Sequence, residues 1–311
     1  MKEFDQDIVI RYIKTHNKTR KLYTYKNQEC ELRNIHKELN GFISKRFVPS
    51  IFSKAYVKNS SIYDNALAHM YNDYFILIDV KDFFRSISHK KLIEKVYKEI
   101  NLNKKNQIKI NECTELIDLC SANKKGLPLG FITSPILSNI FLKEFDCIVY
   151  GKLKRLESLS EKNVIYTRYA DDITISFKYE LEEKSIEIEN EVLNIVSFQL
   201  RRLGLKINRK KTKSYNLNVS NHVKVTGVNI TKTESNYRHL TVGRKTKNQL
   251  YYNTIKAYET SDKKLAEQVK GMYSFILSIE KQGFESVYSE TMMNIIRQHG
   301  FSSLSDMIKQ L

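Results

Sequence analysis

The middle third of the chain alternates between short apolar runs and longer segments in which apolar residues recur at helical spacing. The clearest run, Tyr74-Phe75-Ile76-Leu77-Ile78, predicts a buried strand that ends at Asp79. The same reasoning predicts strands at 74–78, 164–169, 173–177 and 224–230, and helices at 90–100, 112–121, 135–150 and 181–203. Ser134 is the candidate N-cap of the helix at 135–150, with Pro135 at its first position.

The two ends of the chain differ from this middle part. Residues 1–73 are basic and mixed with few strong periodicities, whereas the chain from Arg244 onward has a helical, polar and basic pattern. There are only three prolines and no Pro/Ser-rich linker, so we expect lobes that share one continuous core. Interleaved strands and helices followed by a helical end predict an α+β core with a helical C-terminal lobe.

Net charge adds a prediction about partners. The 311 residues carry 52 basic and 35 acidic side chains, a formal net charge of +17. Such an excess repels itself unless a polyanion neutralises it, so nucleic acid is the first expected partner and an anionic membrane surface the second. A hydrophobic fraction of 41% is too high for a disordered chain.

Composition disfavours several classes of protein and site. The first ten residues carry three acidic side chains and do not resemble a signal peptide, and no run approaches the roughly 18 apolar residues of a membrane span. The seven histidines have no zinc-ligand spacing. The four cysteines form no CxxC pair: Cys30, Cys113, Cys120 and Cys147. We therefore expect a cytoplasmic protein with reduced, mostly packed thiols.

The sharpest local motif is Tyr169-Ala170-Asp171-Asp172, which lies between two predicted strands. Because Asp tolerates the unusual backbone angles of a tight turn, the motif predicts a hairpin with adjacent carboxylates at its tip. Two such charges repel, and a divalent cation such as Mg²⁺ relieves the repulsion through the hard oxygen ligands that it prefers. A solvated Asp-Asp turn is the alternative for this motif alone.

Asp79 is a second acidic position, because a carboxylate at the end of a buried strand is costly unless something pairs with it. Phosphoryl transfer with two metal ions needs carboxylates from different segments, with the ions about 4 Å apart. One ion lowers the pKa of the attacking hydroxyl and the other stabilises the leaving pyrophosphate. Asp79, Asp171 and Asp172 supply such a set. Asp82 is the rival and ranks lower, because the strand is interrupted there.

Two further segments bear on nucleotide binding. Residues 126–135 contain two glycines and two prolines around a turn that opens a helix, where backbone could approach a nucleotide closely. Residues 201–213 contain seven basic residues and no acidic one. A plain loop and a solvated basic face are the alternatives, but the charge of the chain favours a phosphate-facing role for the second segment.

These four elements, in this order and spacing, resemble the palm of reverse transcriptases. Asp79 to Phe84 resembles the first catalytic motif, residues 127–139 the template- and nucleotide-positioning motif, and Tyr169 to Asp172 the YADD hairpin. Residues 204–212 resemble the motif in which a lysine lies near the incoming phosphates, with Lys210 and Lys211 both open as that lysine. The family usually has Gln-Gly where this chain has Leu129-Gly130, and leucine cannot hydrogen-bond to template or nucleotide.

Two shorter matches narrow the resemblance to retron reverse transcriptases. Asn65-Ala66-Leu67-Ala68-His69 matches their NAxxH signature, and Val225-Thr226-Gly227 matches their VTG signature. The resemblance covers roughly residues 20–280. It implies a right-hand polymerase architecture with fingers at 1–73, an RRM-like palm at 74–231 with a fingers-like insertion at about 90–125, and a helical, RNA-binding thumb at 232–311.

The resemblance also implies roles for individual residues. Two Mg²⁺ ions would bind Asp79, the backbone of Val80, Asp171 and Asp172, which form the catalytic set. Nucleotide contacts would come from Phe84, Gly130 and Lys210 or Lys211. The helical lobe, with Arg244, Lys245 and Lys247, is the main candidate for docking structured RNA.

The implied activity is RNA-directed DNA synthesis from dNTPs. The enzyme would recognise its own structured noncoding RNA, prime from an internal 2′-hydroxyl and produce branched RNA–DNA, msDNA. Host RNase H would trim the template, and a retron-encoded effector would act with the enzyme in antiphage defence. The alternatives are a group II intron or abortive-infection reverse transcriptase, a catalytically idle RNA-binding scaffold, and an RNA-synthesising polymerase, in which Phe84 would crowd the ribose 2′-OH.

Overall fold

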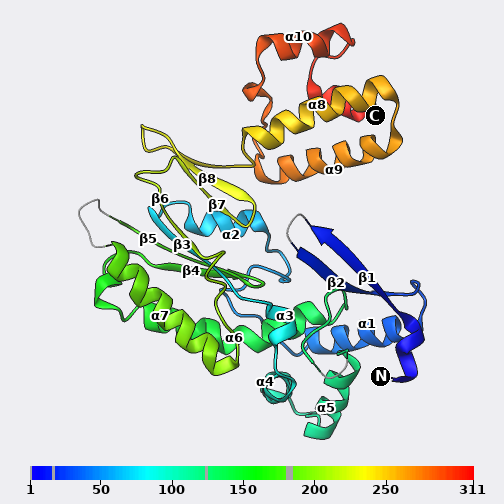
Figure 1. Cartoon of the computed structure of the whole chain (residues 1–311), viewed down its shortest axis with the longest axis vertical. Helices are drawn as coiled ribbons and strands as arrows, with labels where there is room; N and C mark the ends of the chain where they lie inside the picture. The colour runs from blue at the N-terminus through cyan, green and yellow to red at the C-terminus, as the bar shows by residue number, and fades with distance from the viewer. Residues whose placement is uncertain (1, 16–17, 123–124, 180–184) are drawn as a thin grey trace. The chain divides into compact units, whose positions relative to one another are not determined.

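The computed structural model describes residues 2–15, 18–122, 125–179 and 185–311. The chain forms two compact units: Met1–Ser61 with Asn72–Tyr215, and Ile62–Tyr71 with Asn216–Leu311. Each unit combines helices with antiparallel strands (Figure 1), so the predicted α+β class is confirmed. The predicted boundaries between fingers, palm and thumb divide the chain by function and not by compactness, so they stay a prediction.

The first unit is built on a four-stranded sheet in the order β4-β5-β3-β6. Its strands are β3 (Tyr74–Asp79), β4 (Ile165–Tyr169), β5 (Asp172–Phe177) and β6 (Lys213–Asn216). β5 pairs antiparallel with both β3 and β4, in a register that sets Asp79 opposite Asp172. The three central strands are close to the predicted ones. Alternate residues of β3, including Ile76 and Ile78, enter the main hydrophobic core.

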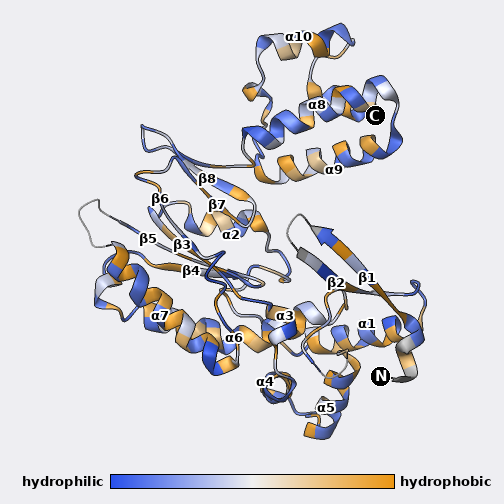
Figure 2. Cartoon of the chain, in the orientation of Figure 1, coloured by the Kyte–Doolittle hydropathy of each residue, from blue (hydrophilic) through white to orange (hydrophobic). Residues whose placement is uncertain are grey.

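Helices complete this core. They are α3 (Phe83–Ser86), α4 (His89–Asn101), α5 (Ile110–Leu119), α6 (Ser134–Leu153) and α7 (Ser185–Leu203), with a 3-10 turn at Glu157–Leu159. Apolar and polar residues alternate along α7 (Figure 2), and Val192 and Val196 of its apolar face are fully buried in the core. Residues 181–184 of the predicted helix at 181–203 lie outside the described residues.

The predicted N-cap of α6 is wrong by one residue. Thr133 is the N-cap and Ser134 is the first helical residue, because the Ser134 hydroxyl donates a hydrogen bond to the carbonyl of Pro128 (2.6 Å). This bond closes the loop before the helix instead of capping the helix end. Pro135 still lies in the first turn, where its missing N–H costs nothing.

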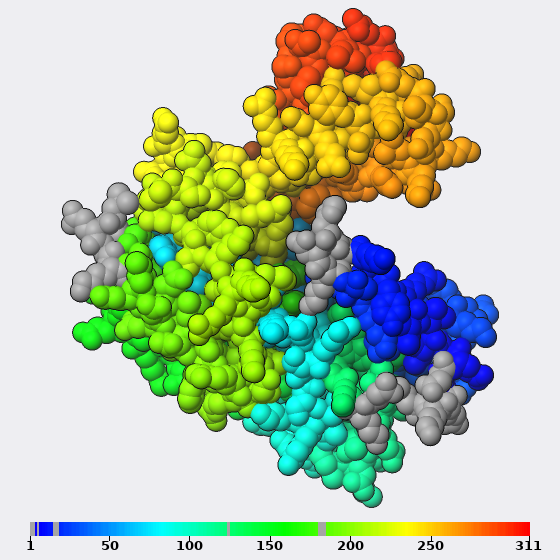
Figure 3. Space-filling view, viewed as in Figure 1, coloured from blue at the N-terminus to red at the C-terminus, as the bar shows by residue number. Residues whose placement is uncertain are grey.

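The N-terminal elements of the first unit were not predicted. A 3-10 helix (Lys2–Asp7) leads into the hairpin β1 (Ile8–Thr15) and β2 (Lys18–Tyr25), followed by α1 (Glu31–Ser44). Figure 3 shows this region (blue) beside the segment that follows α3 (cyan to green). The buried ring of His36 on α1 links them, because its Nε2 lies 3.0 Å from the carbonyl of Leu119.

The second unit contains α2 (Ile62–His69) and a three-stranded antiparallel sheet of β7 (His222–Val225), β8 (Val228–Lys232) and β9 (Arg238–Thr241). The predicted single strand at 224–230 is wrong. Thr226 and Gly227 adopt left-handed backbone conformations (φ 46° and 96°) and turn the chain back on itself as a hairpin.

Helices form the rest of the second unit, as the pattern from Arg244 onward predicts. They are α8 (Arg244–Thr260), α9 (Lys263–Ile279), α10 (Glu290–Gln298) and α11 (Leu304–Lys309), with a 3-10 turn at Glu285–Val287. Within the described ranges no helix is long and apolar enough to cross a bilayer. The prediction of mostly packed thiols is confirmed, since Cys30, Cys113 and Cys120 are buried and Cys147 is exposed, all as free cysteines.

Candidate active site

A pocket of about 500 Å³ opens in the first unit at the end of strand β3. Residues from six separate segments line it: Thr19, Arg20, Tyr56, Asp79, Val80, Lys81, Asp82, Phe83, Phe84, Arg85, Leu129, Asp171, Asn208 and Lys211. The structure therefore brings Asp79, Val80, Phe84, Asp171 and Lys211 to one place, as the sequence motifs suggest. Asp172 is next to this group, paired with Asp79 across β3 and β5.

The Tyr169–Asp172 motif forms the predicted hairpin turn between β4 and β5. Tyr169 pairs with Asp172, so Ala170 and Asp171 are the two turn residues, and Ala170 has a left-handed backbone (φ 57°). The turn is tied to β3, because the Val80 amide donates to the carbonyl of Asp171 (3.1 Å). Tyr56 and Asp82, which line the pocket, also have positive φ angles of 59° and 46°. Strained residues of this kind cluster at functional sites.

The carboxylate of Asp79 is held by two side chains from the basic segment. Lys211 Nζ lies 2.6 Å from its Oδ1, and Asn208 Nδ2 donates to its Oδ2 over 2.9 Å. The backbone N–H of Asn208 also donates to the backbone carbonyl of Asp79 (2.8 Å). Lys211 and not Lys210 lines the pocket, so the geometry favours Lys211 as the lysine of this motif.

The carboxylates carry the electrostatic signature of a site for a cation. Burial first, and then repulsion from Asp171 and Asp79, raise the pKa of Asp172 to about 6. Burial, with Asp79 as a further cause, also raises the pKa of Asp171. Three carboxylates are hard oxygen donors and suit a divalent ion. Among the described residues, however, no three acidic, histidine or cysteine side chains already surround one metal position, and a bound ion would compete with Lys211 for Asp79.

The raised pKa of Asp172 predicts a pH dependence of stability in the metal-free protein. Between about pH 4 and pH 6 the folded state binds more protons than the unfolded state, so the free energy of unfolding falls as pH rises through this window. Asp172→Asn removes this loss. Because the residue is exposed enough for solvent to screen the charge, we expect the variant to be more stable than wild type at pH 7.5 by about 1 kcal/mol.

Urea unfolding in EDTA at pH 4.5 and pH 7.5 measures this difference. The advantage of Asp172→Asn should shrink toward pH 4.5, where the wild-type carboxyl is protonated. A variant that is less stable than wild type at pH 7.5 would contradict the electrostatic account.

Two adjacent aromatic residues begin helix α3 at the edge of the pocket. Phe83 is 2% exposed and belongs to the core, whereas Phe84 is half-buried. Their rings are 5.2 Å apart and steeply inclined to each other, at 61°. As successive residues of a helix the two side chains point in different directions, so that Phe83 is enclosed by the core while Phe84 stays partly accessible.

Gly130 lies where strand β2 crosses the loop before α6. Its backbone has a φ of 105°, and a Cβ atom there would be 2.2 Å from the carbonyl oxygen of Tyr23. The neighbouring Leu129 accepts a hydrogen bond from the Tyr23 amide (2.8 Å), and Ile132 donates to the Tyr25 hydroxyl (3.0 Å). The glycine is therefore required by close contact with backbone, whatever its relation to a nucleotide. Leu129 itself is part of the pocket wall.

We expect Gly130→Ala to destabilise the protein by about 2–3 kcal/mol, because alanine is strained at this positive φ and its Cβ atom would clash with the carbonyl oxygen of Tyr23. Gly151→Ala is the matched control. Gly151 lies within α6, and a methyl group added there would meet no atom within 4 Å, so alanine should be neutral or stabilising at this position. Equal free energies of unfolding for the two variants would show that the Tyr23 contact is easily relaxed.

Sequence reasoning missed several residues of the pocket, among them Thr19, Arg20, Tyr56 and Asn208. Thr19 and Arg20 are on β2, in a region without clear periodicity. Asn208 was within the basic segment but had no distinguishing feature, since its link to Asp79 spans 129 positions. Tyr56 belongs to no sequence motif, and its left-handed backbone is known only from the structure.

The family signatures Asn65, His69, Val225, Thr226 and Gly227 all lie in the second unit. Asn65 and His69 are fully buried on α2, and Asn65 Nδ2 donates to the Thr226 hydroxyl (3.1 Å) at the turn between β7 and β8. The two signatures, far apart in the sequence, thus meet in one place. Their buried side chains have a structural role.

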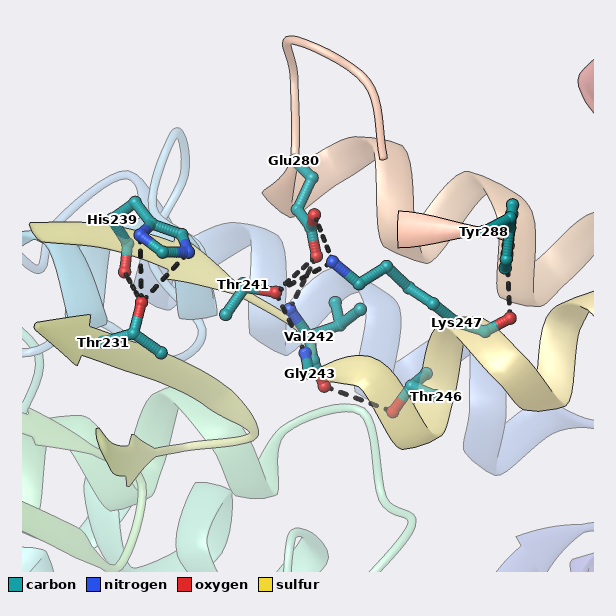
Figure 4. Close-up of polar contacts among 9 residues, drawn as sticks. All are labelled: Thr231, His239, Thr241, Val242, Gly243, Thr246, Lys247, Glu280 and Tyr288. Atoms are coloured by element: carbon teal, nitrogen blue, oxygen red, sulfur yellow. Dashed lines mark hydrogen bonds and ion pairs between the residues drawn. The ribbon is translucent and has the colours of Figure 1, made fainter. Parts of the chain in front are cut away.

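Of the three basic residues proposed for RNA docking, Arg244 and Lys245 lie in the first turn of α8 and both are exposed. Lys247 has protein partners instead (Figure 4). Its ammonium lies 2.9 Å from Glu280, a residue that also accepts hydrogen bonds from the Thr241 hydroxyl and the Val242 amide. Lys247 therefore joins β9, α8 and the end of α9.

An antiparallel sheet that brings Asp79 of β3 and Asp171 of the β4–β5 turn to one pocket, beside a lysine and an aromatic ring, agrees with the fold of right-hand polymerases. The sequence profile of the family described as "Reverse transcriptase (RNA-dependent DNA polymerase)" matches residues 13–230. The chain belongs to this family, as a retron-type member.

The curated relatives support this placement. The Retron Ec73 reverse transcriptase of Escherichia coli is 35% identical over 167 residues, which cover 51% of this chain and 49% of that relative. The Retron Ec86 reverse transcriptase of the same organism is 26% identical, over 84% of this chain and 77% of the relative. The chain therefore spans about half of one relative and about three quarters of the other.

Among solved structures, telomerase from Candida albicans in complex with a fragment of telomeric RNA has a TM-score of 0.51 and 15% identity, covering 97% of this chain and 63% of that chain. At this identity the likeness concerns the fold alone, and it agrees with the predicted right-hand polymerase architecture. Enzymes of the reverse transcriptase family generally use divalent metal ions, an RNA template and dNTPs.

Proposed function

We propose that this chain copies part of a cognate structured noncoding RNA into DNA, with the pocket at the end of β3 as its active site. The observation that supports the proposal most directly is the gathering of Asp79, Asp171, Phe84 and Lys211, from three separate sequence motifs, around one cavity. The contacts between these motifs are not local in sequence. A packing role alone gives no reason for carboxylates with raised pKa values at this point.

The proposed chemistry is nucleotidyl transfer from a dNTP to a primer hydroxyl. Asp79, Asp171, Asp172 and the backbone carbonyl of Val80 would hold two Mg²⁺ ions, which would supply activation of the attacking hydroxyl and charge stabilisation of the leaving pyrophosphate. Asn208 orients the Asp79 carboxylate. Lys211 and Arg20 of β2 supply two cations to the same cavity, which suits the binding of a triphosphate.

The RNA partner is proposed from charge. A net charge of +17 favours a polyanion, and Arg244 and Lys245 lie at the N-terminal end of α8, where the helix dipole disfavours cations. A phosphate group would relieve this repulsion. Structured RNA is read largely through its backbone, shape and unpaired bases, which suits a basic surface.

RNA binding should weaken steeply with salt, because each phosphate contact releases counterions. With about five or more contacts, the slope of log K against log salt should be about −4 or steeper. Filter binding of a structured RNA over a series of KCl concentrations measures the slope. A nearly flat dependence would rule out an electrostatic footprint.

By analogy with retron enzymes, we infer that synthesis starts from a 2′-hydroxyl of an internal guanosine and yields msDNA. The proposed setting is the cytoplasm, with host RNase H trimming the template and a retron-encoded effector completing an antiphage system. The relatives support the retron type, and these further partners follow from it as proposals.

RNA-templated primer extension with labelled dNTPs tests the proposed function. Purified protein should extend a primer on RNA only when Mg²⁺ is present, and EDTA should stop it. Co-expression with a structured noncoding RNA encoded beside the gene should give a product whose mobility changes after treatment with debranching enzyme. Binding of RNA without any extension would identify a scaffold instead of a polymerase.

A further inference from the structure

A fully buried ion pair lies directly beneath the carboxylate hairpin. Arg168 on β4 and Asp146 on α6 both have side chains with 0% exposure. They form two parallel contacts, Nε to Oδ1 at 2.8 Å and Nη2 to Oδ2 at 2.9 Å. The Tyr166 hydroxyl donates a third hydrogen bond to Asp146 (2.8 Å). Burying two charges is costly, and well-packed apolar residues often stabilise a core equally well. The pair therefore calls for a reason other than stability.

The remaining donors of Arg168 point to this reason. Its Nη1 donates to the backbone carbonyl of Ala170 (3.1 Å) and to Asn139 Oδ1 (3.1 Å). Ala170 is the hairpin residue with the left-handed backbone, a conformation that costs an L-residue roughly 1–2 kcal/mol. Asp171 and Asp172 follow it directly. The guanidinium thus binds the strained residue that immediately precedes the two aspartates.

The same network reaches the segment before Tyr56. Asn139 Oδ1 also accepts from the Ser53 hydroxyl (2.9 Å), and Asn139 Nδ2 donates to the carbonyl of Ala55 (2.9 Å). The backbone of Arg168 bonds to Phe52 and Lys54, each over 2.8 Å. One buried polar cluster therefore supports two strained residues of the active-site region, Ala170 and Tyr56.

We propose that Arg168 is a positioning residue, which fixes the Ala170 carbonyl and so sets the direction of the Asp171 and Asp172 carboxylates. Asp146 and Tyr166 hold the guanidinium in the orientation that this requires. The inference rests on the proposed role of the two carboxylates as metal ligands. Groups that orient ligands in this way typically contribute about 10- to 100-fold to metal affinity or activity.

A charge-free double variant separates positioning from stability. Asp146→Leu with Arg168→Met replaces the buried pair by apolar side chains of similar size. The removal of two buried charges and the loss of the acceptor of the Tyr166 hydroxyl act in opposite directions, so the melting temperature should stay close to that of wild type. Its affinity for Mn²⁺, measured by electron paramagnetic resonance without RNA or dNTP, should fall about tenfold or more. Hydrogen exchange of the amides at 169–172 should become faster.

An ion pair elsewhere on α6 provides the matched control. Lys143 binds Glu99 of α4 over 2.6 Å and has no contact with the hairpin among the bonds described. Glu99→Leu with Lys143→Met should leave Mn²⁺ affinity and hairpin exchange unchanged. Wild-type affinity and exchange in the Asp146→Leu/Arg168→Met protein would overturn the proposal.

A second variant tests the proposal if the double variant does not fold. If circular dichroism shows that the double variant is unfolded, Arg168→Lys keeps a cation beside Asp146 but loses the planar fork of donors. It should be folded and should show the faster hairpin exchange, and unchanged exchange would again overturn the proposal. The exchange measurement needs no metal. Failure of wild-type primer extension would contradict the proposed function, whereas hairpin exchange decides the positioning role independently.

Discussion

Asp79→Asn and Asp171→Asn should each lower the rate of DNA synthesis by about 1,000-fold or more while RNA binding stays near the wild-type level. An amide keeps the shape of the side chain but removes the negative charge that divalent ions need, and several kcal/mol of charge stabilisation are lost with it. Asp79 lies against Lys211 and Asn208, and Asp171 lies in the same cavity. Single-turnover primer extension measures the rates, and filter binding measures the RNA affinity.

Asp82→Asn is the matched control, since Asp82 lines the same pocket but belongs to the interruption before α3. We expect a much smaller loss for it than for the other two. Synthesis at wild-type rate by Asp79→Asn or Asp171→Asn would remove these residues from the active site. A loss in Asp82→Asn as large as theirs would show that the ranking of the two acidic positions is wrong.

The second large expected effect concerns how the enzyme discriminates deoxyribonucleotides from ribonucleotides. Phe84 is half-buried at the pocket, five residues after Asp79, and reverse transcriptases place a bulky aromatic at this position beneath the incoming ribose. A ribose 2′-OH would collide with the ring, at a cost of about 1–3 kcal/mol. We therefore expect Phe84→Ala to raise incorporation of ribonucleotides relative to deoxyribonucleotides by at least about tenfold.

Phe83→Ala should behave differently, because Phe83 is a core residue. The free energy of unfolding should fall by about 3–5 kcal/mol, with little change in sugar selectivity. Single-nucleotide incorporation with dNTP and rNTP gives the selectivity of each variant as a ratio, which does not depend on the fraction of folded enzyme. Unchanged selectivity in folded Phe84→Ala would place sugar discrimination elsewhere.

The parts of the structure that could be predicted from sequence depend on local pattern. Strands β3, β4 and β5 are short runs rich in apolar residues beside acidic ones, so both their positions and the meeting of Asp79 with the hairpin follow from antiparallel pairing. The helical end could also be predicted, because its apolar spacing extends over several turns.

What could not be predicted depends on contacts between distant segments. The hairpin β1–β2 has no clean alternation, since Val9, Ile10, Tyr12 and Ile13 all reach solvent to a considerable extent. The requirement for glycine at 130 comes from Tyr23, which is far away in the sequence. The break in the predicted strand at 224–230 comes from two left-handed residues, of which Thr226 is not a typical turn former.

The hydrogen bond between Asn65 and Thr226 bears on how such enzymes can be recombined. The two residues are 161 positions apart, yet they belong to one compact unit that the first unit interrupts in sequence. Any single crossover between residues 71 and 216 takes α2 from one parent and the β7–β8 turn from the other. Chimeras of related enzymes should therefore be designed with two crossovers, so that α2 and the turn are inherited from the same parent.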